Sequence, residues 1–267
     1  MAIVTLDGVL AGMQVPSNII KTATPTLVIG RPHSLLYLAG TPGAAVAPAP
    51  GIAGAALTTY PGQIPFSNPV AGNSYLARFV GQATVAGRLL LCDRLWHNSG
   101  MSITATTAQT INSVAWPARS ADGTVNGVGI QIGVEVSTIL GAGAPIHSIS
   151  YTNQAGTSGK TGTGIITGIT LSAVGAFYMI GLAAGDTGVR SIQTYTRSVS
   201  SVTGVEHLVA FRILASLDLT LANTPNSIDA ISSGFPRLFD NTVLFLLFIP
   251  AAVSASVISG QVVITQG

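Results

Sequence analysis

The stretch VGIQIGVEVS, residues 128–137, alternates strictly between apolar residues and small or polar ones. Its apolar side chains would share one face of an extended chain: Val128, Ile130, Ile132, Val134 and Val136. The other side chains would share the opposite face: Gly129, Gln131, Gly133, Glu135 and Ser137. Because successive side chains of a β-strand point to opposite faces, this repeat of two predicts a strand.

A second long segment, VEHLVAFRILASLDLTL at residues 205–221, carries a similar repeat. One face would hold apolar residues: Val205, Val209, Phe211, Ile213, Ala215, Leu217 and Leu219. The other face would hold Glu206, Arg212, Ser216 and Asp218. A helix that buries part of this run is an alternative. His207 falls on the apolar side, where we expect a hydrogen-bonded core histidine.

Further short segments with strand character follow one another, separated by turn signals such as HNSG, SADG and AAGDTG. They span residues 75–80, 84–96, 101–114, 147–152, 163–171, 176–182, 189–199, 242–249 and 256–265. Two of them, 84–96 and 242–249, are apolar on both faces, as expected between two covering layers. No amphipathic helix of 10 to 15 residues stands out. The sequence therefore predicts an all-β fold, an antiparallel β-sandwich with jelly-roll topology.

The first quarter of the chain has a different composition. Nine of the fourteen prolines precede residue 70, and no charged residue occurs between Arg31 and Arg78. Proline fixes φ and lacks an N–H, so this part should run extended over a surface. We expect an extended N-terminal arm at residues 1–72, ordered on a neighbouring subunit, and a β-sandwich domain at residues 73–267. A disordered linker is the alternative.

The scarcity of charge limits what kind of surface this protein presents. Only 7% of the 267 residues are charged, against about 25% in an ordinary soluble domain, and 48% are hydrophobic. Contacts between proteins deplete Lys, Glu and Asp but retain Arg, and nine of the eleven basic residues are Arg. The composition therefore favours a subunit that other subunits cover. The net charge of +2 is scattered, so we expect no direct nucleic-acid partner.

The segment NQAGTSGKTGTG, residues 153–164, partly matches a phosphate-binding loop. Gly159, Lys160 and Thr161 supply the second half of the motif, but Gln154 stands where the first glycine belongs. The segment GTGIITGITL that follows favours a strand, whereas the motif requires a helix. We therefore predict a flexible, polar hairpin tip with Lys160 in solvent.

Other candidates for chemistry are isolated. Cys92, Asp93 and His97 are close in sequence, but Cys92 and Asp93 would point to opposite faces of a strand. We interpret Cys92 as a buried apolar filler. His33 and His147 lack the spacing of zinc ligands. A carboxylate pair for glycoside hydrolysis stays open, since sequence does not give separations. We expect no catalytic, cofactor-binding or metal-binding residues, no cofactor, and a protein that is not an enzyme.

A membrane span is also not expected. Residues 241–267 carry no charge, but Pro250 interrupts them, and the part after it contains Ser, Gly and Gln. The start of the chain has no positively charged leader, and Asp7 interrupts its apolar stretch, so we do not expect a signal peptide.

The ensemble resembles virion structural proteins of tailed bacteriophages. The similarity rests on the start MAIVTLDGVLAG, the uncharged Pro/Ala/Gly arm, the Gly/Ser/Thr-rich strands and the end TVLFLLFIPAAVSASVISGQVVITQG. It covers the whole chain, without a diagnostic motif. The resemblance implies a capsid decoration (cement) protein that binds itself, as a homotrimer, and the major capsid protein.

Such a protein would be made in the host cytoplasm and reside on the capsid surface of the virion. A tail, baseplate or fibre component is the nearest alternative. A carbohydrate-binding adhesin module is an alternative from another class, although Trp96 and Trp116 do not cluster with other aromatic residues in the sequence.

Overall fold

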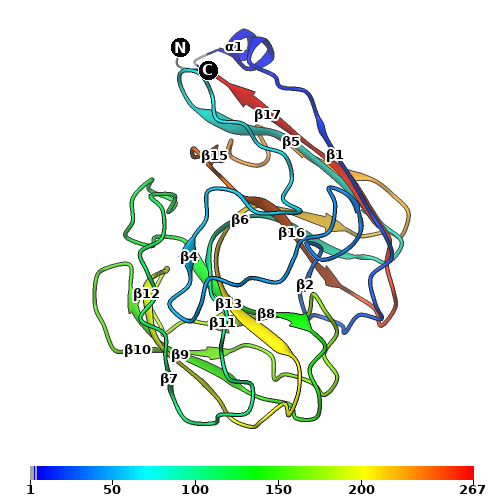
Figure 1. Ribbon diagram of the computed structural model, residues 1–267. Helices are drawn as coiled ribbons and strands as arrows, with labels where there is room; N and C mark the ends of the chain where they lie inside the picture. The colour runs from blue at the N-terminus through cyan, green and yellow to red at the C-terminus, as the bar shows by residue number, and fades with distance from the viewer. Residues whose placement is uncertain (1–2, 4) are drawn as a thin grey trace.

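The computed structural model describes residue 3 and residues 5–267, and nearly all of its regular structure is β-strand (Figure 1). The exception is α1 (Leu6–Ala11), beside the C-terminal end of the chain. Every strand pairing is antiparallel, so the predicted all-β fold is confirmed. Among these residues, no helix has the length and apolar character that a membrane crossing requires.

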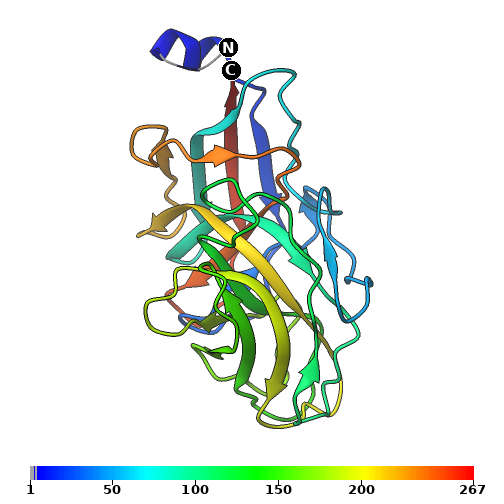
Figure 2. The same cartoon turned by 90° about the vertical axis from the view of Figure 1, so that its left-hand side faces the viewer.

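A six-stranded sheet forms one side of the molecule and extends toward α1 (Figures 1 and 2). Its strands run in the order β14 (Asn226–Asp229), β5 (Ser74–Ala83), β17 (Ile258–Gln266), β1 (Ser17–Lys21) and β3 (Gly40–Thr41), and β15 (Arg237–Leu238) also pairs with β5. The long central pair β5 and β17 shares a ladder from Ser74 to Ala83, which makes this pair the frame of the sheet.

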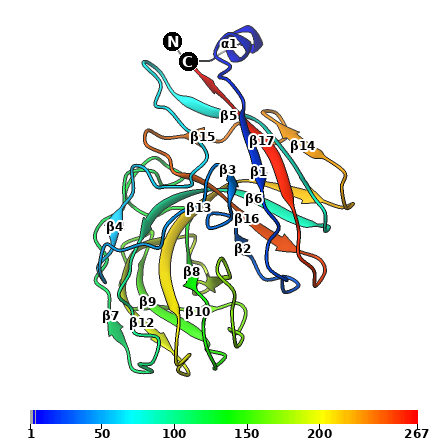
Figure 3. The same ribbon diagram turned by 45° about the vertical axis from the view of Figure 1, so that its right-hand side comes forward.

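An eleven-stranded sheet curls through the rest of the molecule (Figure 3). Its order is β2 (His33–Ser34), β16 (Leu244–Pro250), β6 (Gly87–His97), β13 (Val205–Leu219), β8 (Ile130–Thr138), β11 (Phe177–Gly181), β10 (Lys160–Gly164), β9 (His147–Asn153), β12 (Val189–Arg197) and β7 (Gln109–Thr110). The short β4 (Ala55–Ala56) pairs with the end of β6. The segment at 205–219 is a strand throughout, so the helix alternative for it is wrong.

The first half of the curled sheet closes on itself. The N–H of Ser34 in β2 donates to the carbonyl of Gly175 at 2.7 Å, and the N–H of Phe177 in β11 donates to the carbonyl of Pro32 at 3.0 Å. Since β2 also pairs with β16, the strands β2, β16, β6, β13, β8 and β11 form a ring. We call this ring the barrel.

Strands β6 and β16 are buried on both faces, as their sequences predicted. One face packs against the six-stranded sheet through Leu89 and Leu91 of β6. The other face lines the barrel through Leu90 and Cys92, next to Phe211 and Phe245. These strands therefore form a central layer between two cores, and Cys92 is the buried filler that we expected.

Strand β8 separates the barrel from a third core. Its apolar face, with Ile130, Ile132, Val134 and Val136, packs into the lobe that β9, β10, β11 and β12 enclose. Its other face points into the barrel, where a Cβ at Gly133 would overlap the ring of Phe177. The alternation at 128–137 thus separates two interiors, and Glu135 on the second face is fully buried.

The N-terminal residues are built into these cores. Strand β1 pairs with β17 along its whole length, and Leu36, Leu57 and Tyr60 fill the barrel core. Residues of this segment cover the barrel-facing apolar side of β6 and β16. The segment therefore packs against its own chain. Our expectation that the arm rests on a neighbouring subunit is therefore corrected for β1, Leu36, Leu57 and Tyr60, which pack within their own chain. The boundary between arm (1–72) and domain (73–267) stays a prediction.

Two expected strands are much shorter than predicted. Of residues 101–114, only β7 is a strand, because the Ser102 hydroxyl hydrogen-bonds locally with Thr104 and Ala105 and competes with a ladder. Of residues 163–171, only the start is a strand. The chain then turns, with Leu171 at a φ of 55°.

Candidate functional site

The few charged side chains of this protein are distributed unevenly between interior and surface. Nine of the twenty are buried: Lys21, Arg31, Asp93, Arg94, Arg119, Glu135, Arg197, Glu206 and Arg212. Eleven remain for a surface of 10522 Å², although the side chain of Asp186 is itself only 5% exposed: Asp7, Arg78, Arg88, Asp122, Lys160, Asp186, Arg190, Asp218, Asp229, Arg237 and Asp240. The surface is therefore even poorer in charge than the composition indicated.

An ion pair lies inside the barrel. A guanidinium nitrogen of Arg94 is 2.7 Å from Oε2 of Glu135, and both side chains are fully buried. The Tyr37 hydroxyl donates to the same oxygen at 3.0 Å, and the guanidinium lies over the Tyr60 ring. Burial alone would raise the pKa of Glu135, but the charge and hydrogen bond of Arg94, together with smaller contributions from Ser34 and His207, hold this pKa below its usual value. The pair is therefore charged and enclosed.

A second buried pair joins Asp93 to Arg119. The carboxylate accepts from Nε of Arg119 at 2.9 Å and from a terminal nitrogen at 3.1 Å, and it also accepts the N–H of Val243 at 3.0 Å. The remaining donors of Arg119 reach the carbonyls of Leu57, Asn241 and Arg94. Both carboxylate oxygens of Asp93 are thus bound by Arg119.

A third buried group links β9, β12 and β13. The Tyr195 hydroxyl donates to Glu206, a terminal nitrogen of Arg197 lies 3.3 Å from the same carboxylate oxygen, and Nδ1 of His147 lies 2.8 Å from the Tyr195 hydroxyl. Burial raises the pKa of Glu206 and lowers that of His147 to about 3. These groups therefore form a closed polar cluster at the edge of the third core.

His207 is the hydrogen-bonded core histidine that its position predicted. Its Nδ1 is 2.9 Å from the carbonyl of Asn98, and its Nε2 is 2.6 Å from the hydroxyl of Ser137. A serine in contact with a neutral imidazole is the start of a nucleophilic arrangement. However, burial lowers the pKa of His207 to about 4, which makes it a weak base, and neither residue lines any groove described below. The contact connects β8 and β13.

The predicted hairpin is present: residues 154–159 form the turn between β9 and β10, and residues 160–164 are β10 itself. Oδ1 of Asn153 accepts the N–H groups of Ala155 and Thr157, and a strand follows the turn where a phosphate loop would need a helix. Residues 155–159 are exposed. Lys160 is the first residue of β10, is 34% exposed and lies 3.9 Å from Asp186, so our expectation that it stands in solvent at the hairpin tip is corrected: it is only partly exposed.

The end of the six-stranded sheet exposes hydrocarbon. Helix α1 buries none of its side chains, and Leu6 and Leu10 are 72% and 57% exposed. Beside the helix, Ile231 is 91% exposed in the turn that follows β14. A groove of about 370 Å³ lies between helix and turn, lined by Ile3, Thr5, Leu6, Val9, Ala230, Ile231 and Phe235. We call these residues, with Leu10, the end surface.

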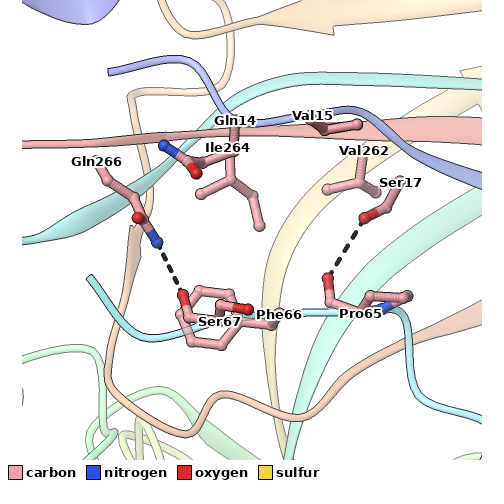
Figure 4. A pocket seen from close by; sticks show the side chains of 9 residues that line it. All are labelled: Gln14, Val15, Ser17, Pro65, Phe66, Ser67, Val262, Ile264 and Gln266. Carbon is pink, nitrogen blue, oxygen red and sulfur yellow. Dashed lines mark hydrogen bonds between the residues drawn. The ribbon is translucent and has the colours of Figure 1, made fainter. Parts of the chain in front are cut away.

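A second groove lies on the inner side of the same sheet end (Figure 4). It holds about 220 Å³ between β17 and the segment 65–67. Its walls are tied together by the Gln266 amide, which donates to the Ser67 carbonyl at 2.8 Å, and by the Ser17 hydroxyl, which is 3.4 Å from the Pro65 carbonyl. Val15, at its rim, is 90% exposed.

The end surface is what our sequence reasoning missed. The signal was present, because Leu6, Val9 and Leu10 have the spacing of one helical face. The sequence did not indicate that Ile231 and Phe235 belong to the same surface, because only the fold brings residues 230–235 next to residues 5–10. Among the described residues, no group of three or more His, Cys, Asp or Glu side chains is placed to hold a metal ion.

Comparisons with known proteins give little. No family model matches the chain, and no curated protein matches it. Weakly similar solved structures include the crystal structure of the infectious bursal disease virus VP2 subviral particle, 10% identical over 96% of this chain and 82% of that one, with a TM-score of 0.23. Another is the structure of the infectious bursal disease virus Gt strain, 10% identical over 95% and 82%, with a TM-score of 0.20. At these TM-scores the similarity supports no conclusion about the fold or the function of this chain.

Proposed function

We propose that the protein is a structural subunit of a virus particle, a decoration protein that binds an assembled tailed-phage capsid and stabilises it as a symmetric oligomer. The observation that carries the proposal is the surface, which has at most eleven charged side chains on 10522 Å² and exposed leucines at the end surface. Large apolar residues exposed together at one place indicate a contact with another protein.

The partners in this proposal are a second and third copy of the chain and the major capsid protein, at the capsid surface. The charged residues outside the buried set are six acidic and five basic, which produce no positive field for nucleic acid. A protein that binds the assembled shell and not its dissociated subunits shifts the equilibrium toward the shell by mass action. This role involves no catalytic step and no cofactor.

The proposal is tested by mass and by co-sedimentation. We expect the purified protein to have a mass that is a multiple of 27.0 kDa and to pellet with empty capsids. A monodisperse monomer that stays in the supernatant would overturn the proposal. An oligomer that binds tails and not shells would instead support the tail or fibre alternative.

The adhesin alternative receives less support from the side chains. Sugar-binding modules present exposed aromatic faces, whereas Trp96 and Trp116 pack edge to face in the third core and are 0% and 2% exposed. Binding of this protein to a glycan array would favour that alternative.

A further inference from the structure

Helix α1 is fixed at the sheet end in a position that keeps its leucines in solvent. The hydroxyl of Thr265 donates to the carbonyl of Val9 at 2.7 Å, and the N–H of Gln266 donates to the carbonyl of Gly12 at 2.9 Å. A Cβ at Gly12 would collide with the carbonyl oxygen of Gln266, so only glycine permits this approach. The helix is therefore docked through the carbonyls of Val9 and Gly12, while Leu6 and Leu10 stay 72% and 57% exposed.

The opposite side of the groove is also held in place. Oδ1 of Asp229 accepts the N–H groups of Ile231 at 3.1 Å and Ser232 at 2.9 Å, and Phe235 stacks on Tyr75 with ring centroids 4.6 Å apart. Ile231 is thus presented outward by a hydrogen-bonded turn. Preorganised apolar groups on both sides of a groove reduce the ordering cost of binding.

A short helix without buried side chains is not stable by itself. Isolated helices below about 12 residues are marginal in water, and α1 has six residues. Its N-cap, the Thr5 hydroxyl that accepts from the N–H of Gly8 at 3.1 Å, satisfies only one of the free N–H groups. The apolar face of α1 therefore lacks the packing that stabilises helices in proteins.

The charges around the end surface favour a second copy of this chain as the occupant. Asp7 on α1 and Asp229 at the start of the turn are exposed, and so is Arg237, whose guanidinium donates to Oδ1 of Asn73 at 2.6 Å. A patch that carries both signs is complementary to itself, so two copies can face each other across it about a two-fold axis. A strongly acidic partner would instead place like charges against Asp7 and Asp229, and a strongly basic partner against Arg237.

We infer that the end surface is a contact between copies of this chain, in which Leu6 and Leu10 of one copy enter the groove beside Ile231 and Phe235 of the next. This inference rests on the proposed role as an oligomeric subunit, and it adds a two-fold contact between copies, which is distinct from the contact that would close a trimer. The apolar side chains form the centre of the contact, and Asp7 and Arg237 form its rim.

The test is the double variant Leu6→Gln, Leu10→Gln, which keeps helix-forming residues and removes the apolar face. We expect wild-type protein to self-associate and the variant to need about 100-fold higher concentration to do so, by sedimentation velocity. The matched control is Leu221→Gln, Val253→Gln, at two exposed residues in turns at the other end of the sheet, both 64% exposed. The control variant should associate like wild type.

A cross-link provides a second measurement that does not depend on the variant's stability. The native Cys92 is buried, so a Leu10→Cys variant carries one accessible thiol. A short bis-maleimide should join two copies of Leu10→Cys and should not join copies of Val253→Cys. Absence of the cross-linked dimer, in protein that associates, would overturn the inference.

The outcomes separate this inference from the proposed function. If wild type and double variant associate equally, the end surface is not the contact, and the capsid proposal stands. If wild type is monomeric at every concentration, the inference is wrong, and co-sedimentation with capsids then decides the proposed function by itself.

Discussion

The barrel and the end surface distribute polarity in opposite ways. Inside the barrel, Arg94 and Glu135 form an ion pair without exposure to water, whereas at the end surface Leu6 and Ile231 are 72% and 91% exposed. A monomer that only had to stay soluble would gain from the reverse arrangement. The difference indicates that charge in this protein is used to organise the interior, while the outside is kept suitable for contact with protein.

The two regions also differ in what removing a side chain does. A buried ion pair contributes little over a hydrocarbon core of the same shape, but loss of one partner leaves an unpaired charge in a low-dielectric site. Loss of an exposed leucine leaves the folded monomer almost unchanged. Substitutions in the barrel should therefore change stability, and substitutions in the end surface should change association.

The largest effect is expected from deletion of residues 1–72. This removes β1 from the six-stranded sheet and takes Leu36, Leu57 and Tyr60 from the barrel core. We expect no cooperative thermal unfolding transition. Deletion of residues 1–12, which removes α1 only, is the control and should keep the transition. A cooperative transition in the longer deletion would show that the arm is not part of the cores.

Next in size is Arg94→Met. The buried Glu135 then keeps Tyr37 but loses its counter-charge, at a cost of about 3 to 5 kcal/mol in the free energy of unfolding. The double variant Arg94→Met, Glu135→Leu removes both charges and should recover most of that loss. Urea denaturation measures both. A loss below about 1 kcal/mol in the single variant would contradict the enclosed ion pair.

A smaller effect is expected from acidification. Burial lowers the pKa of His207 to about 4 and that of His147 to about 3, below the ordinary value of 6.5. The unfolded chain then binds more protons, so stability should fall as the pH drops from 6.5 toward 4, by about 2 kcal/mol per histidine at pH 5.

The urea midpoint at pH 7 and pH 5 measures this effect. In His207→Gln, which cannot acquire charge, the drop between the two pH values should be smaller than in wild type. An equal drop would mean that His207 does not titrate as its burial requires.

The smallest effect is expected from Lys160→Ala beside the hairpin turn. The lysine is partly exposed and 3.9 Å from Asp186, and such surface pairs contribute about 0 to 1 kcal/mol. The thermal midpoint should stay within error of wild type. A large decrease in the thermal midpoint would show that this turn contributes to stability as much as the barrel does.

Local patterns in the sequence predicted the strands but not which interiors they face. The repeat at 128–137 placed Glu135 opposite the valines, yet only the fold shows that Arg94 and Tyr37 enclose it. Likewise, the double apolar face of residues 84–96 predicted two covering layers, and the identity of one cover, residues 36–60, came from the structure. Contacts between distant segments, such as α1 with residues 230–235, leave no local pattern to read.

The central claim is that the apolar surface of this protein binds other protein copies. The most direct test of this claim is sedimentation velocity of the wild-type protein at about 0.05 M and 0.5 M salt. An association through apolar groups should persist at the higher salt, so we predict species heavier than 27.0 kDa at both. A 27.0 kDa monomer under both conditions, at all concentrations, would contradict the account.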